Sequence, residues 1–401
     1  MKRVVPTLMA LAAVVLLAFG YAELSEGQMG GRDRDRNRFE GPIADFPLTA
    51  LPREFSTPPD NPQSPEKVEL GRLLFWDPIL SGNQQVACAT CHHPDFGYAE
   101  DLALSIGVDG AGLGGDRRFV TSDPIPFVKR NSQTILNTAF NGIDLEGGYD
   151  PITAPMFWDE RARGLEAQSL LPILTFEEMR GHAYPEEDAV DTVIARLQAI
   201  PEYRSLFVDA FEGESAVSAE NLGKALAAFQ RSLVANNSPY DRYMRGETNA
   251  MTRLQIRGMR RFEQVGCINC HNGPMFSDYE LRVLGIRDNR LLPESDSGAI
   301  DQPYAFRTPS LRNLAYTAPY MHNGLFRTLE DVVEFYDDVG DRDERNVNLE
   351  RNQVDPLTRT LDDPDDHERE LIAFLNALND DNFDREIPDR VPSGLNPGGE
   401  I

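Results

Sequence analysis

Two short stretches decide the fold of this chain, Cys88-Ala89-Thr90-Cys91-His92 and Cys267-Ile268-Asn269-Cys270-His271. Each has two cysteines with two residues between them and a histidine directly after, and the 401-residue sequence has no other cysteine. This spacing is typical of c-type haem attachment, in which two thiols bond to one porphyrin and the adjacent histidine binds the iron. We therefore predict two covalently bound haems, with His92 and His271 as iron ligands.

Two other uses of paired cysteines fit less well. Four-cysteine zinc sites usually place the second pair about 15 to 20 residues after the first, whereas 175 residues lie between Cys91 and Cys267. Structural disulfides suit an exported protein, but they do not require a histidine after each pair.

The first residues of the sequence indicate export. Lys2 and Arg3 precede an uncharged, largely apolar stretch over 4–22, which ends with the small residues Gly20 and Ala22. This pattern predicts a signal peptide over 1–22, with an uncleaved membrane anchor as the alternative. Because no later stretch is long and apolar enough to span a bilayer, we expect a periplasmic protein with no membrane span after cleavage.

The charge of the chain argues against nucleic-acid binding. Lysine and arginine number 39 and aspartate and glutamate 65, which gives a net charge of −26, whereas a nucleic-acid binder needs a basic surface. Hydrophobic residues make up 41% of the chain, enough for sizeable cores. A solvated acidic surface or a basic protein partner accounts for the charge.

The hydrophobic pattern predicts a mainly α fold with two cytochrome c-like helical domains, each with one covalent c-type haem. Helices are expected over 65–76, 189–200, 218–234, 254–264, 329–336 and 368–378, and no strand alternation is evident. The expected parts are a flexible N-terminal lead-in over 23–61, haem domains over 62–240 and 241–380, and a tail over 381–401. The domain boundary is placed in the polar segment 236–250, and we expect the haem pair near the domain interface.

Two haems allow two classes of function. An electron carrier has both irons fully ligated, whereas an enzyme keeps one iron open for peroxide or oxygen and needs an acid–base group beside it. Candidates for the open side lie in 156–179, namely Trp158, Gln168, Pro172 and Glu178. The alternatives are that Trp158 packs in the core and that Glu178 is a solvated helix carboxylate.

Over 70–378 the sequence resembles the bacterial di-haem cytochrome c peroxidase family, which includes MauG. Trp158 and the aspartate after it are followed at offsets of 10, 14 and 20 by Gln168, Pro172 and Glu178, as in that family. The resemblance implies that Trp158 lies between the haems and that Pro172 packs close to the open, peroxidatic haem. It also implies that Gln168 and Glu178 lie over that haem, with Glu178 as the acid–base. Glu160 departs from the glycine common in the family, which leaves the local turn open.

Two further segments are similar to the family and imply a calcium ion between the haems. Arg130-Asn131-Ser132 resembles its Arg-Asn-Thr/Ser-Pro segment, although Gln133 replaces the proline, and 317–324 resembles its Tyr-Phe/Met-His-Asp-Gly loop. The implied ligands are the Asn131 side chain and the carbonyls of Thr317 and Pro319. Oxygen ligands suit calcium; the alternative is that Asn131 caps a turn.

Two positions favour the MauG-like subtype. Family members that need reductive activation have a histidine 16 residues after the first haem histidine, where this chain has Val108. The distal ligand of the second haem is a methionine in conventional members, whereas this chain has Tyr336 there, as MauG-like members do. Met321 is the rival ligand. A phenolate stabilises high oxidation states better than a thioether does.

The expected function is therefore that of a peroxide-dependent haem oxidoreductase. Hydrogen peroxide reacts at the open N-terminal haem, and the second haem passes the oxidising equivalents to an external electron donor or to side chains of a partner protein. One alternative is a conventional peroxidase that takes electrons from a small cytochrome c or a copper protein. The other is a non-enzymatic di-haem electron carrier.

Overall fold

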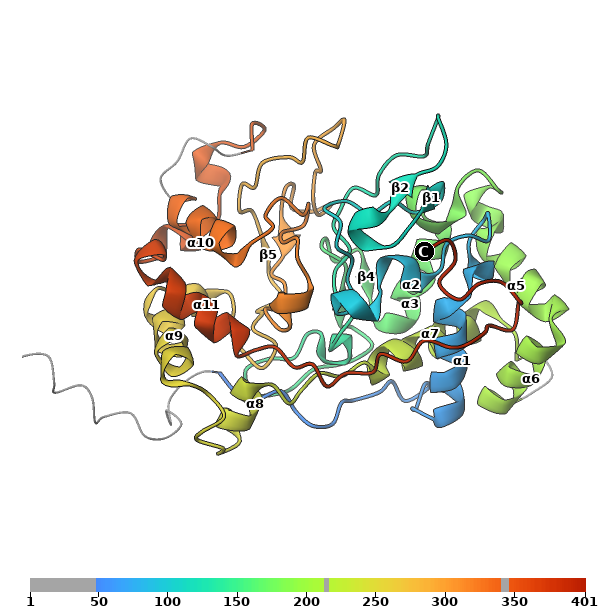
Figure 1. The fold of residues 1–401 in the computed structure, drawn as a ribbon, viewed down its shortest axis with the longest axis horizontal. Helices are drawn as coiled ribbons and strands as arrows, with labels where there is room; N and C mark the ends of the chain where they lie inside the picture. Colours follow the sequence, from blue (N-terminus) through green and yellow to red (C-terminus); the bar gives the residue numbers. More distant parts are fainter. Residues whose placement is uncertain (1–47, 213–215, 340–345) are drawn as a thin grey trace, which may run out of the picture. The chain divides into compact units, whose positions relative to one another are not determined.

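Two crossed helix pairs organise the two halves of the chain (Figure 1). Helix α1 (Pro65–Trp76) crosses α7 (Ala219–Ser232), and α9 (Arg253–Gln264) crosses α11 (Glu368–Asn376). This computed structural model describes residues 48–212, 216–339 and 346–401. The predicted signal peptide and most of the predicted lead-in lie outside the described residues.

The helices begin where the sequence supplies caps. The Ser64 and Ser218 side chains accept from the backbone N–H groups of Lys67 and Asn221, at the start of α1 and α7. Such caps satisfy N–H groups that have no partner within the helix. A capping box at Thr328 likewise starts α10 (Leu329–Asp338). Together with α5 (Ala189–Ala199), these elements confirm the predicted helices.

The remaining elements are short. The other α-helices are α2 (Cys88–Cys91), α3 (Leu165–Gln168), α4 (Leu171–Leu174), α6 (Pro201–Ala210) and α8 (Pro239–Met244). Three two-residue antiparallel pairs make up the strands, namely β1 (Gly110–Ala111) with β2 (Arg118–Phe119), β3 (Pro155–Met156) with β4 (Ala162–Arg163), and β5 (Leu281–Arg282) with β6 (Phe306–Arg307). The 3₁₀ turns are Pro78–Leu80, Pro94–Phe96, Gly114–Asp116, Thr138–Phe140, Glu186–Asp188, Cys267–Asn269, Leu314–Tyr316, Arg351–Gln353, Pro356–Thr360 and Asp365–His367, and Phe176–Arg180 is a π turn. The mainly α prediction is confirmed.

The same contact holds both helix pairs together. A Cβ added to Gly71 of α1 would lie 2.1 Å from the Ala225 carbonyl oxygen, and one added to Gly258 of α9 would lie 1.9 Å from the Glu370 carbonyl oxygen. In each pair the glycine therefore lets two backbones touch. A phenylalanine four residues later meets another on the partner helix, with ring centroids 5.1 Å apart for Phe75–Phe229 and 5.3 Å apart for Phe262–Phe374.

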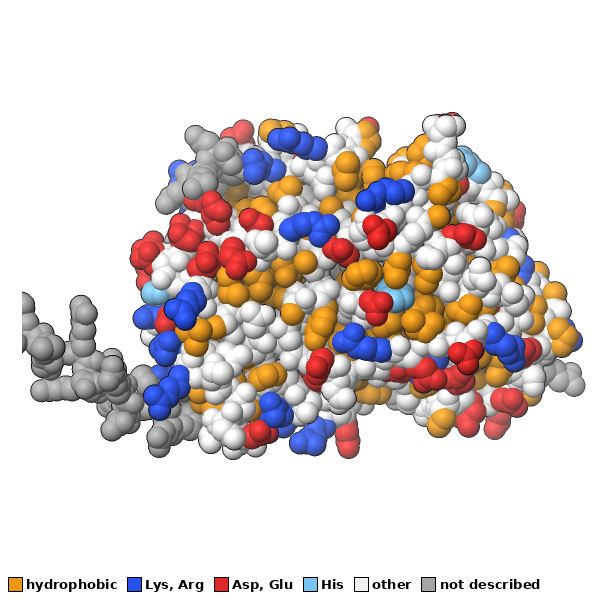
Figure 2. All heavy atoms as spheres, in the orientation of Figure 1, with side chains coloured by type: hydrophobic (Ala, Val, Ile, Leu, Met, Phe, Trp, Pro, Cys, Tyr) orange, Lys and Arg blue, Asp and Glu red, His pale blue; other side chains and the backbone are white. Residues whose placement is uncertain are grey.

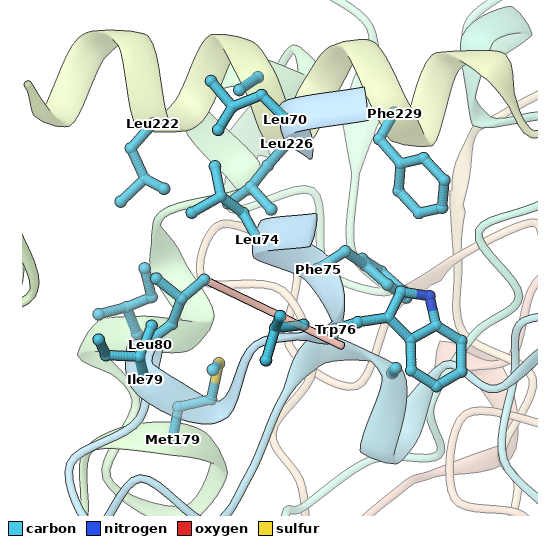
Figure 3. Close-up of a cluster of buried hydrophobic side chains, with 14 of the residues drawn as sticks. Leu70, Leu74, Phe75, Trp76, Ile79, Leu80, Met179, Leu222, Leu226 and Phe229 are labelled. Carbon is cyan, nitrogen blue, oxygen red and sulfur yellow. The ribbon is translucent and has the colours of Figure 1, made fainter. Parts of the chain in front are cut away.

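The core around α1 shows what this crossing buries. Figure 3 shows Leu70, Leu74 and Phe75 of α1 facing α7, which contributes Leu222, Leu226 and Phe229. All six side chains are buried. The apolar faces of the two helices thus supply the packing that a short helix needs for stability.

Helix α8 lies within 236–250, the polar segment in which the sequence places the domain boundary. Asp241 of α8 is fully buried and accepts hydrogen bonds from Arg312 at 2.9 and 3.0 Å and from the Leu51 backbone N–H at 2.9 Å. Polar residues here therefore hold distant segments together. The described end of the lead-in is likewise anchored, because Leu48 and Leu51 are buried.

The C-terminal tail runs back along α1 (Figure 1). Arg72 of α1 pairs with Asp384 at 2.6 Å, and the Ser393 hydroxyl donates to Asp77 at 2.7 Å. Further on, the Gly398 N–H donates to the Trp76 carbonyl at 2.7 Å. None of the helices in 48–212, 216–339 and 346–401 has the length and apolarity needed to cross a membrane.

We predict that Gly258→Ala destabilises the protein by about 3 kcal/mol, the upper end of the usual cost of overpacking. The added methyl group must push the α9 and α11 backbones apart. Chemical denaturation measures the free energy of unfolding. Gly148→Ala is the control, because its Cβ meets only the end of the Asp144 side chain, at 3.1 Å; equal losses in both variants would contradict the prediction.

Candidate active site

The two motif histidines are oriented by the same hydrogen bond. Nδ1 of His92 lies 3.1 Å from the Tyr98 carbonyl oxygen, and Nδ1 of His271 lies 2.9 Å from the Phe276 carbonyl oxygen. A carbonyl only accepts, so Nδ1 carries the proton and Nε2 keeps its lone pair. Burial lowers the pKa of both histidines, which favours the neutral ring. This is the form in which histidine binds a metal.

A cavity of about 420 Å³ adjoins the first motif, and we call it the first cavity. Its walls include all the predicted residues of the first centre, namely Cys88, Cys91, His92, Trp158, Gln168, Pro172 and Glu178. The structure therefore brings together residues that lie up to 90 positions apart in the sequence.

The lining of the first cavity fits a haem. All four cysteines of the chain are free, which argues against the disulfide alternative. The Gln168 Oε1 atom is buried and has no hydrogen-bond partner within the described residues. An unpaired polar atom in a cavity wall is typical of a binding site rather than a core.

Glu178 faces the first cavity from the π turn Phe176–Arg180. Burial raises the pKa of this carboxyl to about 6, with the Arg161 charge lowering it and the Glu177 charge raising it. A carboxyl with such a pKa exchanges protons near neutral pH, as a general acid–base must. Glu178 is half-buried and stands in a π turn, which favours the acid–base role over the alternative of a solvated helix carboxylate.

The loop at 105–108 fixes the backbone of Glu178. The Val108 N–H donates to the Glu178 carbonyl oxygen at 3.1 Å. A Cβ on Gly107 would lie 2.2 Å from that same oxygen, so only glycine fits there. The Val108 side chain is buried in the hydrophobic core. Val108, at the position where some family members have a histidine, therefore helps to hold the Glu178 backbone in place in this chain.

Trp158 lines both cavities of the chain, the first and a second one described below. Its indole N–H donates to the Asn131 carbonyl at 3.0 Å. The turn that carries it has two left-handed residues, Phe157 with φ 67° and Glu160 with φ 55°. Glu160 thus adopts the conformation that glycine tolerates best, which accounts for the glycine expected there.

An ion-pair network holds this turn. The Arg130 guanidinium pairs with Asp159 at 2.7 Å and with Asp296 at 2.6 Å, and it joins the turn to the second half of the chain. Burial raises the pKa of both aspartates, but the Arg130 guanidinium outweighs it, so the pKa of each is lowered. Arg161 also pairs with Asp159, at 2.8 Å. Arg161 and Asp159 both lie in the candidate segment 156–179, but the sequence alone assigns no role to either.

A second cavity, of about 250 Å³, adjoins the second motif. Its walls include Cys267, Cys270, His271, Trp158, Met321 and Tyr336. Helix α10 turns one face to this cavity, made of Leu329, Val332, Val333 and Tyr336 at helical spacing. Burial raises the pKa of Tyr336, and the nearby Cys270 and Cys267 charges add to the effect. Both Tyr336 and its rival Met321 thus lie at this centre.

The predicted calcium ligands also meet at the second cavity. Asn131, Thr317 and Pro319 all line it, and Asn131 lines the first cavity as well. The Asn131 side-chain amide donates to the Leu102 carbonyl at 2.9 Å, which fixes the direction of its own oxygen. The three predicted ligand residues, from two distant segments, therefore all lie in the wall of the second cavity.

The fold and the site define a class of protein, a mainly helical chain with two cytochrome c-like centres that share one tryptophan. Comparison with known proteins agrees. A family model described as di-haem cytochrome c peroxidase matches residues 65–249. The chain is 33% identical over 331 residues to the methylamine utilization protein MauG of Methylorubrum extorquens, with 82% of each chain covered. The chain therefore belongs to the di-haem cytochrome c peroxidase family.

Two other similar proteins extend this finding. The cytochrome-c peroxidase IdrP1 of Pseudomonas sp. (strain SCT) is 33% identical over 367 residues, with 83% of this chain and 85% of that protein covered. A crystal structure of a MauG-like protein associated with microbial copper homeostasis superposes with a TM-score of 0.66 at 27% identity, and covers 85% of this chain and 96% of that one. The predicted enzyme class, a peroxide-dependent haem oxidoreductase, and its two haem cofactors are thereby confirmed.

The left-handed backbone of the Trp158 turn can be tested by substitution of Glu160. We predict that Glu160→Gly is about 1 kcal/mol more stable than Glu160→Ala, the usual cost of a Cβ in the left-handed region. Both changes remove the 2.7 Å ion pair with Arg163, so this contact cancels in the comparison. Thermal and chemical denaturation measure the difference, and equal stabilities would show that φ is not held positive at this position.

Proposed function

We propose that this chain reduces hydrogen peroxide at a haem in the first cavity and passes the oxidising equivalents, through the second centre, to a partner protein. The observation that carries the proposal is that Trp158 lines both cavities, while Glu178 and Gln168 line only the first. An acid–base group on one side and an aromatic side chain shared by both centres are what such a reaction needs.

Each of these residues of the first cavity has a separate role in the proposed reaction. Cys88 and Cys91 would hold the haem covalently and His92 would bind its iron, which would supply the site that accepts peroxide and its oxidising equivalents. Glu178 takes a proton from the incoming peroxide and returns it to the departing oxygen. The unpaired Gln168 Oε1 accepts a hydrogen bond from the bound peroxide. Pro172 fills the wall beside them and helps to exclude water.

At the second centre, Cys267 and Cys270 would hold the other haem, and His271 and Tyr336 would bind its iron. The cationic iron would remove the phenolic proton despite the raised pKa of Tyr336, because metal charge outweighs burial. A calcium ion held by the Asn131 side chain and the Thr317 and Pro319 carbonyls would then lie between the centres.

The MauG-like subtype rests on individual residues, because MauG and a peroxidase are equally similar to this chain at 33% identity. Val108 is buried and cannot bind iron, so the first haem is open without prior reduction. Tyr336 favours stored oxidising equivalents over a high-potential electron reservoir. We therefore favour oxidation of partner-protein side chains over electron uptake from a small cytochrome c or copper protein.

Export completes the proposal. The predicted signal peptide over 1–22 would direct the chain to the periplasm, where c-type haems and a redox partner protein would be available. The acidic net charge of −26 suits a partner with a basic surface.

The first test mixes the fully ferric protein with stoichiometric peroxide, without reductant, and follows the haem spectrum by stopped flow. We expect a rapid change, with a rate that rises as the pH is raised through about 6, because only the Glu178 carboxylate accepts a proton. Glu178→Gln should abolish this pH step and slow the reaction by about 10²–10⁴-fold, with haem content unchanged. A reaction that requires prior reduction of one haem would indicate a conventional peroxidase, and no reaction in either state would indicate an electron carrier.

The second test concerns the distal ligand of the second haem. Tyr336→Met should raise its reduction potential by on the order of 0.1 V, since axial ligands shift haem potentials over about 0.8 V. Redox titration followed by the haem spectrum measures the change. Met321→Leu is the control, and a potential that moves with Met321 but not with Tyr336 would assign the ligand to Met321.

A further inference from the structure

Arg161 is a cationic residue of the first cavity that has no role in the reaction proposed above. Three cationic side chains line this cavity, Lys129, Arg130 and Arg161. Arg130 is committed to two carboxylates, Asp159 and Asp296. Among the groups whose charges act on Glu178, Arg161 is the cation. Arg161 therefore combines a position in the wall with an electrostatic effect on the acid–base.

The Arg161 side chain is held in place and yet reaches solvent. Its guanidinium stacks on the Phe157 ring at 3.7 Å from the centroid, and one arm donates to Asp159 at 2.8 Å. The side chain is 36% exposed, so it contacts solvent as well as lining the first cavity. A guanidinium has five N–H donors in a fixed fork, so the stack and the Asp159 contact leave donors for a ligand.

The charged groups around Glu178 affect its protonation in opposite directions. Burial and the Glu177 charge both disfavour the Glu178 carboxylate, and Arg161 favours it. Cys88 and Cys91 of the motif also lie within electrostatic range of Glu178, but thiols bonded to a haem carry no charge. Among the charged side chains of the protein, Arg161 and Glu177 are therefore the ones that act on the proton affinity of Glu178.

We propose that Arg161 is an anion-binding residue of the first cavity, which draws small anions to the haem and holds the hydroperoxide anion while Glu178 holds its proton. The proposal rests on the function proposed above. The step is a proton transfer: hydrogen peroxide and the Glu178 carboxylate give the hydroperoxide anion and the Glu178 carboxylic acid. The O–H bond of peroxide breaks, an O–H bond forms on Glu178, and the negative charge moves to the oxygen that Arg161 faces. No oxidant or reductant is needed.

Azide and imidazole binding to the ferric haem protein test this proposal without turnover. Azide is an anionic haem ligand and imidazole a neutral one, and the shift of the haem spectrum reports both. We expect Arg161→Gln to weaken azide binding about tenfold, the size of one charge-assisted hydrogen bond, and to leave imidazole binding within about twofold. Azide binding should weaken as the pH rises and Glu178 becomes a carboxylate. In Arg161→Gln this change should move to higher pH, because removal of the cation favours protonated Glu178.

Two further variants isolate the charge at this position. Arg161→Lys keeps the charge and should retain most of the azide affinity. Arg163→Gln removes an exposed arginine two residues away, paired with Glu160, and should change nothing. If Arg161→Gln binds azide as the wild type does, or if Arg161→Lys loses as much as Arg161→Gln, the proposal is wrong. A larger loss in Lys129→Gln would assign the role to Lys129 and also overturn it.

The wild-type protein provides a test that does not depend on folding of a variant. Added salt should weaken azide binding and leave imidazole binding unchanged, because an exposed cation is screened; equal salt effects on both ligands would contradict the proposal. The proposed function fails separately, since a first haem with two fixed ligands would bind neither azide nor imidazole in the wild type.

Discussion

The hydrogen bond from each motif histidine to a backbone carbonyl is the constraint on which both centres depend. Tyr98 and Phe276, which provide the carbonyls, both adopt left-handed φ values, 56° and 54°, and these aim the carbonyl back at the imidazole. The helix crossings also contribute to the cavity walls, because Phe75 lines the first cavity and Phe262 the second. One local turn and one glycine-mediated crossing thus occur in both halves of the chain.

The two halves differ in what faces the histidine. In the first half, the wall comes from the loop-rich segment that carries Gln168 and Glu178, and the π turn places a buried carboxyl there. In the second half, α10 turns an apolar face with Tyr336 to the cavity. The Glu178 carboxyl, with its raised pKa, suits proton-coupled reaction of a small molecule, whereas the Tyr336 phenol in an aliphatic helix face suits storage of charge. The asymmetry required by the proposed function therefore arises from these two segments alone.

Features that depend on neighbours in the sequence were predictable. The motifs, the Ser-capped helices and the Trp158 segment all carry their signal within about twenty residues. Helix α8 was missed because the burial of Asp241 depends on Arg312 and Leu51, each far away in the sequence. Likewise, the supporting role of Val108 depends on its backbone contact with Glu178. A polar segment predicts a solvent-exposed loop when the partners that bury it lie far away in the sequence, and only the folded structure shows those partners.

The Asp159 carboxylate links the position of Trp158 to the charge at Glu178. It follows Trp158 directly and binds both Arg130, which joins the second half of the chain, and Arg161, which faces the first cavity. Its pKa is lowered by both arginines, so it stays ionised while Glu178 titrates near neutral pH. If Arg161 shifted toward a bound anion, Asp159 would lose one of two partners, and the Arg130 pair would carry more of the turn. The shared carboxylate thus connects Arg161, in the wall of the first cavity, to the Arg130 pair that joins the second half of the chain.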